Sequence, residues 1–181
     1  TKALADFKAG KITALVATLL LGGCSNRSLG NKIDDQFLDP NVNAAIRDAA
    51  PDLSSPTSHI VTTSYNGVIL IAGQTPRADL KERAGRAARS VQGVTKVHNE
   101  LQIMEPTSLI VRSNDALITS QIKTLMLADA DVPSSRIKVI TENGVVFLLG
   151  IVTRQEAANA TSVVENANGV QKIVRLFEYT N

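Results

Sequence analysis

Two stretches of the chain share one pattern of polar and apolar residues. Asn66-Gly67 precedes the apolar run 68–72, and Asn143-Gly144 precedes the apolar run 145–149. Asn-Gly before an apolar run is typical of a type I′ hairpin turn, because that turn needs positive φ at both central residues. Each copy follows a β-rich segment and leads to a helical pattern that ends near a Gly-Val pair. Self-similarity in this order predicts one small unit that is present twice.

The predicted order in each unit is helix, strand, strand, helix, strand. In the second unit, the first helix has its apolar stripe at Ile118, Ile122 and Leu125. Its predicted cap is Asn114 or Asp115. A hairpin gives an antiparallel pair, and a return through a helix favours a third strand parallel to the second. The prediction is an α+β fold with two tandem αββαβ domains, each a mixed three-stranded sheet packed on two helices.

The second helix of each unit has its own start signal. In the first unit, Thr75-Pro76 predicts a capping Thr followed by Pro at the first helical position. In the second unit, Thr153 and Glu156 have the spacing of a capping box. Both helices are therefore expected to begin directly after their hairpins.

Composition divides the rest of the chain. The N-terminal residues combine lysines with an apolar run too short to cross about 30 Å of hydrocarbon, which is typical of a signal peptide. The residues after it are polar and predict a flexible tether, followed by a short helix around Asn41–Ala49. The apolar residues Leu109–Val111 are expected to pack between the two units. The predicted segments are a signal peptide (1–23), a lipidated N-terminus and tether (24–38), a first domain (39–104), a linker (105–112) and a second domain (113–181).

Cys24 is the only cysteine of the chain. With residues 21–23 before it, it resembles a bacterial lipobox, in which the cysteine is lipidated and becomes the new N-terminus. The resemblance implies three acyl chains, palmitate among them, and two or more chains hold a protein stably on a membrane. Ser25, where Asp would favour the inner membrane, favours sorting to the outer membrane. The alternative is a short core helix with a buried cysteine.

Charge and composition exclude several classes of function. The net charge is +2, but the residues from Cys24 onward carry equal numbers of acidic and basic side chains. Aromatic residues make up 3% of the chain and there is no Trp. A neutral chain with few stacking side chains is not expected to bind nucleic acid. His59 and His98 have no acidic or thiol motif beside them, so we expect structural roles and predict no catalytic residue, metal or cofactor.

The duplicated set of motifs resembles the BON (bacterial OsmY and nodulation) domain family. The residues that carry the resemblance are the Asn-Gly hairpins closed by Gly73 or Gly150, and the late Gly-Val followed by Lys-Val or Lys-Ile. Two such domains behind a lipobox resemble the dual-BON outer-membrane lipoproteins. The resemblance implies no catalytic activity, a place on the periplasmic face of the outer membrane, and binding of phospholipid, preferably anionic, that supports the integrity of this membrane.

The same resemblance suggests where lipid binds. In related lipoproteins the contact lies on the first helix of the second BON domain, near an exposed aromatic, and Leu117 takes that position here. Leu117 and Leu127 lie off the core stripe, with Lys123 on the same outer side. We therefore predict a shallow lipid contact at these three residues. The alternatives are packing between domains, simple solvent exposure, or a Leu127 already in the following loop.

Two further alternatives concern partners. In the first alternative, the protein is an adaptor whose BON domains bind an envelope protein, such as the machinery that inserts outer-membrane barrels. The other concerns the basic helix, which would either touch anionic head groups or be a solvated face with i,i+4 ion pairs. The basic residues of this helix are Arg77, Lys81, Arg83, Arg86 and Arg89.

Overall fold

The structure is a computed structural model that describes residues 29–181, with side chains described from Asp35 onward. The predictions for residues 1–23 and for Cys24 lie outside the described residues. In chain order the elements are α1 (Leu29–Ala49), the 3₁₀ helix η1 (Pro51–Leu53), β1 (His59–Tyr65), β2 (Val68–Thr75), α2 (Ala78–Arg89), β3 (Lys96–Asn99), β4 (Gln102–Ile103), α3 (Leu109–Ala128), the 3₁₀ helix η2 (Ser134–Arg136), β5 (Ile137–Glu142), β6 (Val145–Val152), α4 (Arg154–Glu165) and β7 (Lys172–Tyr179).

The topology of both sheets is as predicted, except that the third strand of the first unit is divided into β3 and β4, so its sheet has four strands and not three. β1 pairs antiparallel with β2, and β2 pairs parallel with β3 and, further along, with β4. In the second unit β5 pairs antiparallel with β6, and β6 pairs parallel with β7. The prediction of an α+β fold with two mixed sheets is therefore confirmed.

The two hairpin turns have the predicted backbone. Asn66 and Gly67 have φ values of 53° and 79°, and Asn143 and Gly144 have φ values of 50° and 74°. These positive values are those of a type I′ turn, which matches the right-handed twist of the strands it joins.

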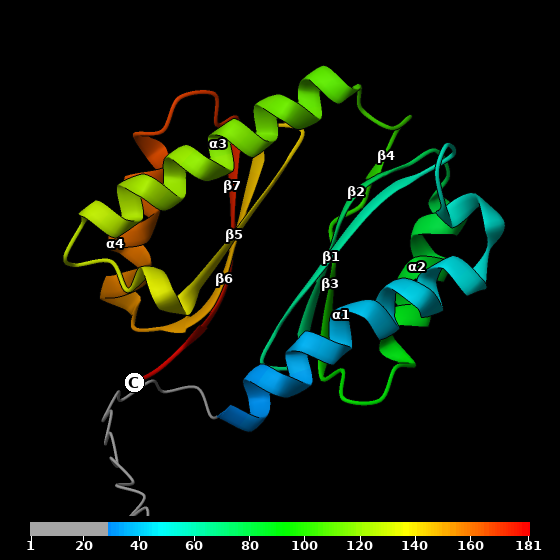
Figure 1. Ribbon diagram of the computed structural model, residues 1–181, viewed down its shortest axis with the longest axis horizontal. Coiled ribbons are helices and arrows are strands. Elements are labelled where there is room, and N and C mark those ends of the chain that lie inside the picture. The colour runs from blue at the N-terminus through cyan, green and yellow to red at the C-terminus, as the bar shows by residue number, and fades with distance from the viewer. Residues whose placement is uncertain (1–28) are drawn as a thin grey trace, which may run out of the picture.

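The two sheets pack face to face between two layers of helices (Figure 1). Each sheet buries one face against its own two helices. The other faces meet in a third apolar cluster, to which the first sheet contributes Tyr65, Leu70 and Ala72. The second sheet contributes Phe147 and Leu149 to the same cluster. Both central strands are thus covered on both sides, which explains their continuous apolar runs.

Polar contacts at the rim of this interface fix how the two sheets meet. The Lys138 ammonium donates a hydrogen bond to the Ser64 carbonyl oxygen. Asn143 Nδ2 donates to Gln102 Oε1 over 3.1 Å, so the second hairpin turn is bonded to β4 of the first unit. The expectation that Leu109–Val111 would pack between the units was wrong, because the sheets fill that interface.

The first helix of the second unit begins earlier than predicted. α3 starts at Leu109, inside the predicted linker, and its N-cap is Ser108, whose hydroxyl accepts a hydrogen bond from the Val111 N–H. Asn114 and Asp115 therefore lie inside the helix. Its buried apolar positions are Ile118, Ile122 and Met126, while Leu125 packs at the margin of the core. All three predicted positions of the stripe therefore contact the core, and Met126 is added to them.

Two other helix starts also differ from the prediction. α1 begins at Leu29, so a part of the predicted tether is helical, and the exposed Pro40 lies within the helix without ending it. α2 begins at Ala78 with Arg77 as N-cap, because Thr75 stays in β2 and pairs with Ile103 of β4.

The α4 start is as predicted. The Thr153 hydroxyl accepts a hydrogen bond from the Glu156 N–H, and the Glu156 carboxylate accepts one from the Thr153 N–H. This reciprocal pair is the capping box.

Candidate functional site

The outer face of α3 carries large apolar side chains that no other part of the described chain covers. Leu109, Ile110, Leu117 and Leu127 expose 76%, 82%, 69% and 75% of their surface, respectively. They are exposed because the opposite face of the helix enters the core at Ile118, Ile122 and Met126. Large apolar residues gathered on one exposed face mark an interaction surface.

The exposed face of α3 carries a positive charge and no negative charge. The charged side chains of α3 are Arg112, Asp115 and Lys123. Asp115 is buried, while Lys123 is exposed beside Leu127. The exposed face of α3 therefore presents apolar groups, small polar groups and a cation, with no exposed carboxylate.

Asp115 is buried because it holds the hairpin turn of its own domain. Its carboxylate accepts hydrogen bonds from the Asn143 and Gly144 N–H groups, at 2.8 and 2.9 Å. A carboxylate paired with two backbone donors makes strong, charge-assisted bonds. This contact places α3 relative to the sheet and fixes which side of the helix faces outward.

The structure brings two of the three predicted residues together. Lys123 and Leu127 line a hollow of about 210 Å³ between the end of α3 and the edge strand β5. Leu117 lies on the same helix about 15 Å away along its axis. The other residues around this hollow are Met126, Ser134, Ser135, Ile137 and Val139.

Leu109 and Ile110 belong to this face, although the sequence pattern predicted a linker at these positions. The sequence signal for their helix was present, because Ser108 is a favoured N-cap residue directly before an apolar run. The Asn114-Asp115 pair resembles a helix start more strongly, so the helix was predicted to begin at that pair.

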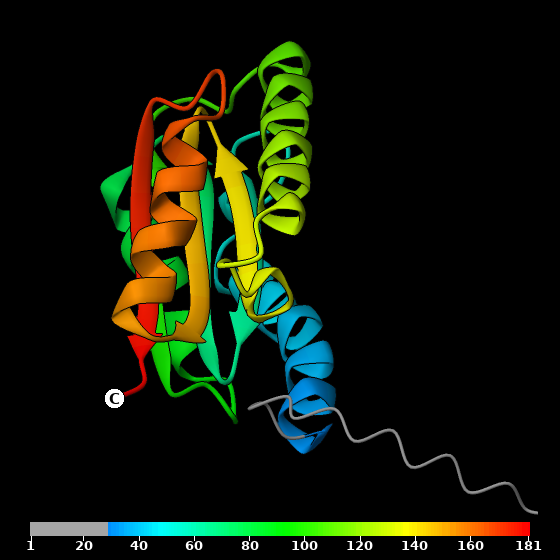
Figure 2. The same ribbon diagram turned by 90° about the vertical axis from the view of Figure 1, so that its left-hand side faces the viewer.

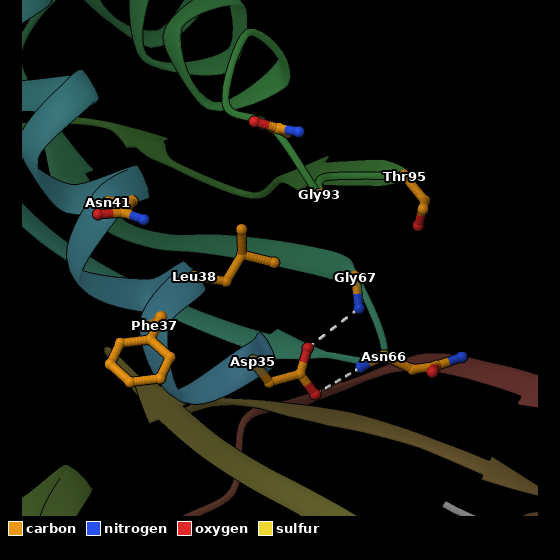
Figure 3. A pocket seen from close by; sticks show the side chains of 9 residues that line it. Asp35, Phe37, Leu38, Asn41, Asn66, Gly67, Gly93 and Thr95 are labelled. Carbon is orange, nitrogen blue, oxygen red and sulfur yellow. Dashed lines mark hydrogen bonds between the residues drawn. The ribbon is translucent and has the colours of Figure 1, made fainter. Parts of the chain in front are cut away.

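The first unit has a counterpart of this arrangement on α1. The Asp35 carboxylate accepts hydrogen bonds from the Asn66 and Gly67 N–H groups, at 2.8 and 3.1 Å (Figure 3). Phe37 follows Asp35 by two positions, as Leu117 follows Asp115. A hollow of about 570 Å³ opens beside the turn and is lined by Asp35, Phe37, Leu38, Asn41, Asn66, Gly67, Gln92, Gly93 and Thr95.

Two segments of the chain match one family model. The BON domain model matches residues 38–105 and residues 114–181. The chain belongs to the BON domain family. Its two units are therefore a first and a second BON domain in tandem, and α3 is the first helix of the second BON domain.

Several bacterial proteins are similar to this dual-BON chain. It is 36% identical over 170 residues to the outer membrane lipoprotein DolP of Haemophilus influenzae, a match that covers 94% of this chain and 84% of the relative. It is 35% identical over 153 residues to the 21 kDa hemolysin of Actinobacillus pleuropneumoniae, covering 84% of this chain and 78% of the relative. It is 33% identical over 152 residues to osmotically-inducible protein Y of Escherichia coli, covering 82% of this chain and 74% of the relative. The chain is a dual-BON protein of the DolP type.

The basic helix α2 of the first BON domain has partners for part of its charge. Arg77 is paired with Asp52 at 3.1 Å and with Asp79 at 3.0 Å, and its hydrogen bond lowers the pKa of the Asp79 carboxyl. Arg86 is paired with Glu82 at 3.6 Å, as the i,i+4 spacing predicted. These pairs favour the interpretation of α2 as an ordinary solvated face.

Three polar residues between the BON domains form a small, partly buried group. Gln74 Nε2 donates a hydrogen bond to Glu142 Oε2 over 3.5 Å, and His59 Nε2 lies 3.6 Å from the same oxygen. Burial raises the pKa of Glu142 to about 7, although the hydrogen bond from Gln74 lowers it. The negative charge of Asp115 makes a smaller contribution to the increase. Burial also lowers the pKa of His59. Both shifts favour the neutral forms, so near neutral pH this contact holds the domains together without a full ion pair.

The histidines and the helices suggest no further chemistry. Burial lowers the pKa of His98, and the positive charge of Lys96 lowers it further. Within residues 29–181, His, Cys, Asp and Glu side chains nowhere gather in a group of three or more that suits a metal ion. None of the helices in that range has the length and apolar character needed to cross a bilayer.

Proposed function

We propose that this protein is an outer-membrane lipoprotein without enzymatic activity. Acyl chains on Cys24 hold it at the periplasmic face, and the outer face of α3 in the second BON domain binds phospholipid, preferably anionic. Through this contact the protein supports the integrity of the outer membrane. The observation that carries the proposal is the row of exposed apolar side chains on α3, with Lys123 among them and no exposed carboxylate.

The physical chemistry of α3 suits a shallow contact with a bilayer. A helix lying in the membrane interface buries its apolar face to a depth of about 5–10 Å and keeps its polar groups in water. The apolar side chains that enter the interface would be those of Leu109, Ile110, Leu117 and Leu127. A lysine near an anionic surface contributes about 1 kcal/mol, and Lys123 is placed to do so.

Anchoring makes a weak contact sufficient. A protein tethered to a bilayer meets its lipid at a high effective concentration, so that a second contact of low intrinsic affinity is largely occupied. The similarity to an outer membrane lipoprotein over 94% of this chain supports the same location for this protein.

Flotation of residues 25–181 with vesicles tests the lipid part of the proposal. We expect binding to vesicles that contain phosphatidylglycerol and weaker binding to phosphatidylcholine alone. Leu117→Glu and Leu127→Glu should each weaken binding about tenfold, because each removes an apolar side chain that would enter the bilayer and adds a charge that anionic lipid repels. Ala158→Glu on the exposed face of α4 is the charge-matched control and should change binding little.

The outcomes separate the proposal from its rival. Equal failure to bind both kinds of vesicle would remove the phospholipid function. A protein partner that is captured after lipid removal, and lost with Leu117→Glu, would instead favour the adaptor. Mass spectrometry of the membrane-extracted protein tests the anchor, because acylation adds a defined mass to an N-terminal Cys24.

A further inference from the structure

The first BON domain presents an apolar residue at the position that Leu117 occupies in the second. Asp35 and Asp115 are equivalent, since each clamps the Asn-Gly turn of its own domain through two backbone N–H groups. Phe37 and Leu117 each follow this aspartate by two positions, on the outer side of the first helix of a domain. Phe37 exposes 64% of its surface, close to the value of 69% for Leu117.

Among the described side chains of α1, the neighbours of Phe37 carry no exposed charge. The exposed residues of α1 around it are Gln36, Pro40, Asn41 and Ala44. Asp39 is half-buried, and burial raises the pKa of its carboxyl against the effects of Ser64 and Lys138. From position 35 to position 46, α1 therefore has no exposed charged side chain that would oppose entry into the head-group region.

The covalent chain keeps Phe37 near the proposed anchor. The segment between Cys24 and the first residue of α1, Leu29, spans at most about 18 Å even when fully extended. Phe37 lies about 12 Å further along the helix axis. If Cys24 is held at the bilayer surface, Phe37 lies within about 30 Å of that surface in every arrangement of the chain.

α1 and α3 belong to opposite helix layers, and both lie at the same edge of these layers (Figure 1). Figure 1 shows both in front of the paired sheets, and Figure 2 shows both at the right-hand side, with α4 on the other side. One bilayer can therefore approach the first helix of both domains.

We propose that α1 is a second membrane contact of this protein, in which Phe37 enters the interface of the bilayer that holds the acyl chains of Cys24. This inference rests on the anchor of the proposed function. An aromatic ring suits the membrane interface better than an aliphatic side chain. Because positions 35–46 of α1 have no exposed cation, we expect this contact to depend less on anionic lipid than the contact at Lys123.

Single-tryptophan variants of the full, acylated protein test the proposal. The natural chain has no Trp, so Phe37→Trp, Leu117→Trp and Tyr179→Trp each place one indole at a known position. Tyr179 is the matched control, because it is a partly exposed aromatic at the end of β7, outside both helices. Each variant is reconstituted in vesicles of phosphatidylethanolamine, with or without phosphatidylglycerol, and each composition is prepared with and without dibrominated acyl chains.

We expect the indole at position 37 to emit at shorter wavelength in vesicles and to be quenched by the brominated chains, equally with and without phosphatidylglycerol. The indole at position 179 should stay unquenched. Cys24→Ser should abolish most of the quenching at position 37, since the anchor brings α1 to the bilayer. An unquenched indole at position 37 in the acylated protein, or quenching unchanged by Cys24→Ser, would overturn the inference.

Position 117 separates this inference from the proposed function. Quenching at position 117 but not at position 37 leaves the α3 contact standing and removes the α1 contact. Quenching at position 37 alone establishes the α1 contact and removes the α3 contact.

Discussion

The two BON domains share their internal construction and differ on their surfaces. Each has an aspartate in its first helix that clamps an Asn-Gly turn, and each has a mixed sheet with the same strand order. Phe37 stands where the second domain has Leu117. Thr95 lies over the turn glycine of the first domain, while the longer Gln171 lies over that of the second. The shared residues determine the fold, so a difference in function between the domains must come from the exposed positions.

The interface between the sheets is where a substitution should affect both domains most. Phe147 is buried in the cluster that joins the domains. Phe147→Ala should lower the free energy of unfolding by about 4 kcal/mol, since it removes apolar contacts and leaves a cavity. Urea unfolding measures the loss. A single transition in the natural protein that splits into two in the variant would show that the domains stabilise each other, and an unchanged midpoint would contradict that role.

Substitution of Asp35 and Asp115 tests whether the stability of the two domains depends equally on the hydrogen bonds between the aspartate and the Asn-Gly turn. Asp115→Ala leaves the Asn143 and Gly144 N–H groups without their acceptor and should cost about 3 kcal/mol. Asp35→Ala is the matched change in the first domain and should cost a similar amount. Thermal unfolding of both variants gives the comparison. A loss below about 1 kcal/mol for either would mean that water replaces the carboxylate at that turn.

The Glu142 contact predicts a dependence of stability on pH. Its pKa is raised from 4.5 to about 7 in the folded protein, so its contribution is fully present below pH 4.5 and is lost as pH rises through about 7. Between pH 5 and 7.5 we expect a loss of about 2 kcal/mol, reduced from the full shift because the carboxyl is partly solvated.

Glu142→Gln should remove this slope. Burial lowers the pKa values of His59 and His98, so their own contribution to stability grows as pH rises, and both histidines remain in the Glu142→Gln variant. Urea midpoints at several pH values provide the measurement. The same slope in the variant and the natural protein would assign the effect to another group.

The smallest expected effect concerns the exposed position that distinguishes the domains. Leu117→Phe makes the second domain like the first at this position and should strengthen vesicle binding about threefold, because an aromatic ring favours the interface. Gln121→Phe, on the same helix but partly buried, is the control for a general gain in apolar surface. Equal gains for both variants would argue against a specific contact at position 117.

The sequence was sufficient for the fold because its strongest signals are local. The Asn-Gly turns, the apolar runs of the central strands and the capping box at Thr153 each act over a few residues. Helix starts were predicted less well. Asn114-Asp115 has the composition of a cap, yet Asp115 bonds a turn that lies far along the chain, and only the tertiary structure reveals that partner.

The candidate site was predicted in part. Helical periodicity placed Leu117, Lys123 and Leu127 away from the core stripe, and the structure finds all of them exposed on α3. Periodicity did not find Leu109 and Ile110, because their inclusion depends on where the helix begins. The binding of phospholipid by this face stays a prediction, since exposure shows that a surface is available and not what covers it.

The face-to-face packing of the two sheets has a consequence for how such chains are built. Each domain brings an apolar β surface that its own helices leave bare, and here the other copy within the polypeptide covers it. The protein is in this sense a dimer made by duplication inside one chain. A polypeptide with a single copy of this unit, keeping an apolar residue such as Leu70 or Phe147, would need another molecule against that surface to remain soluble.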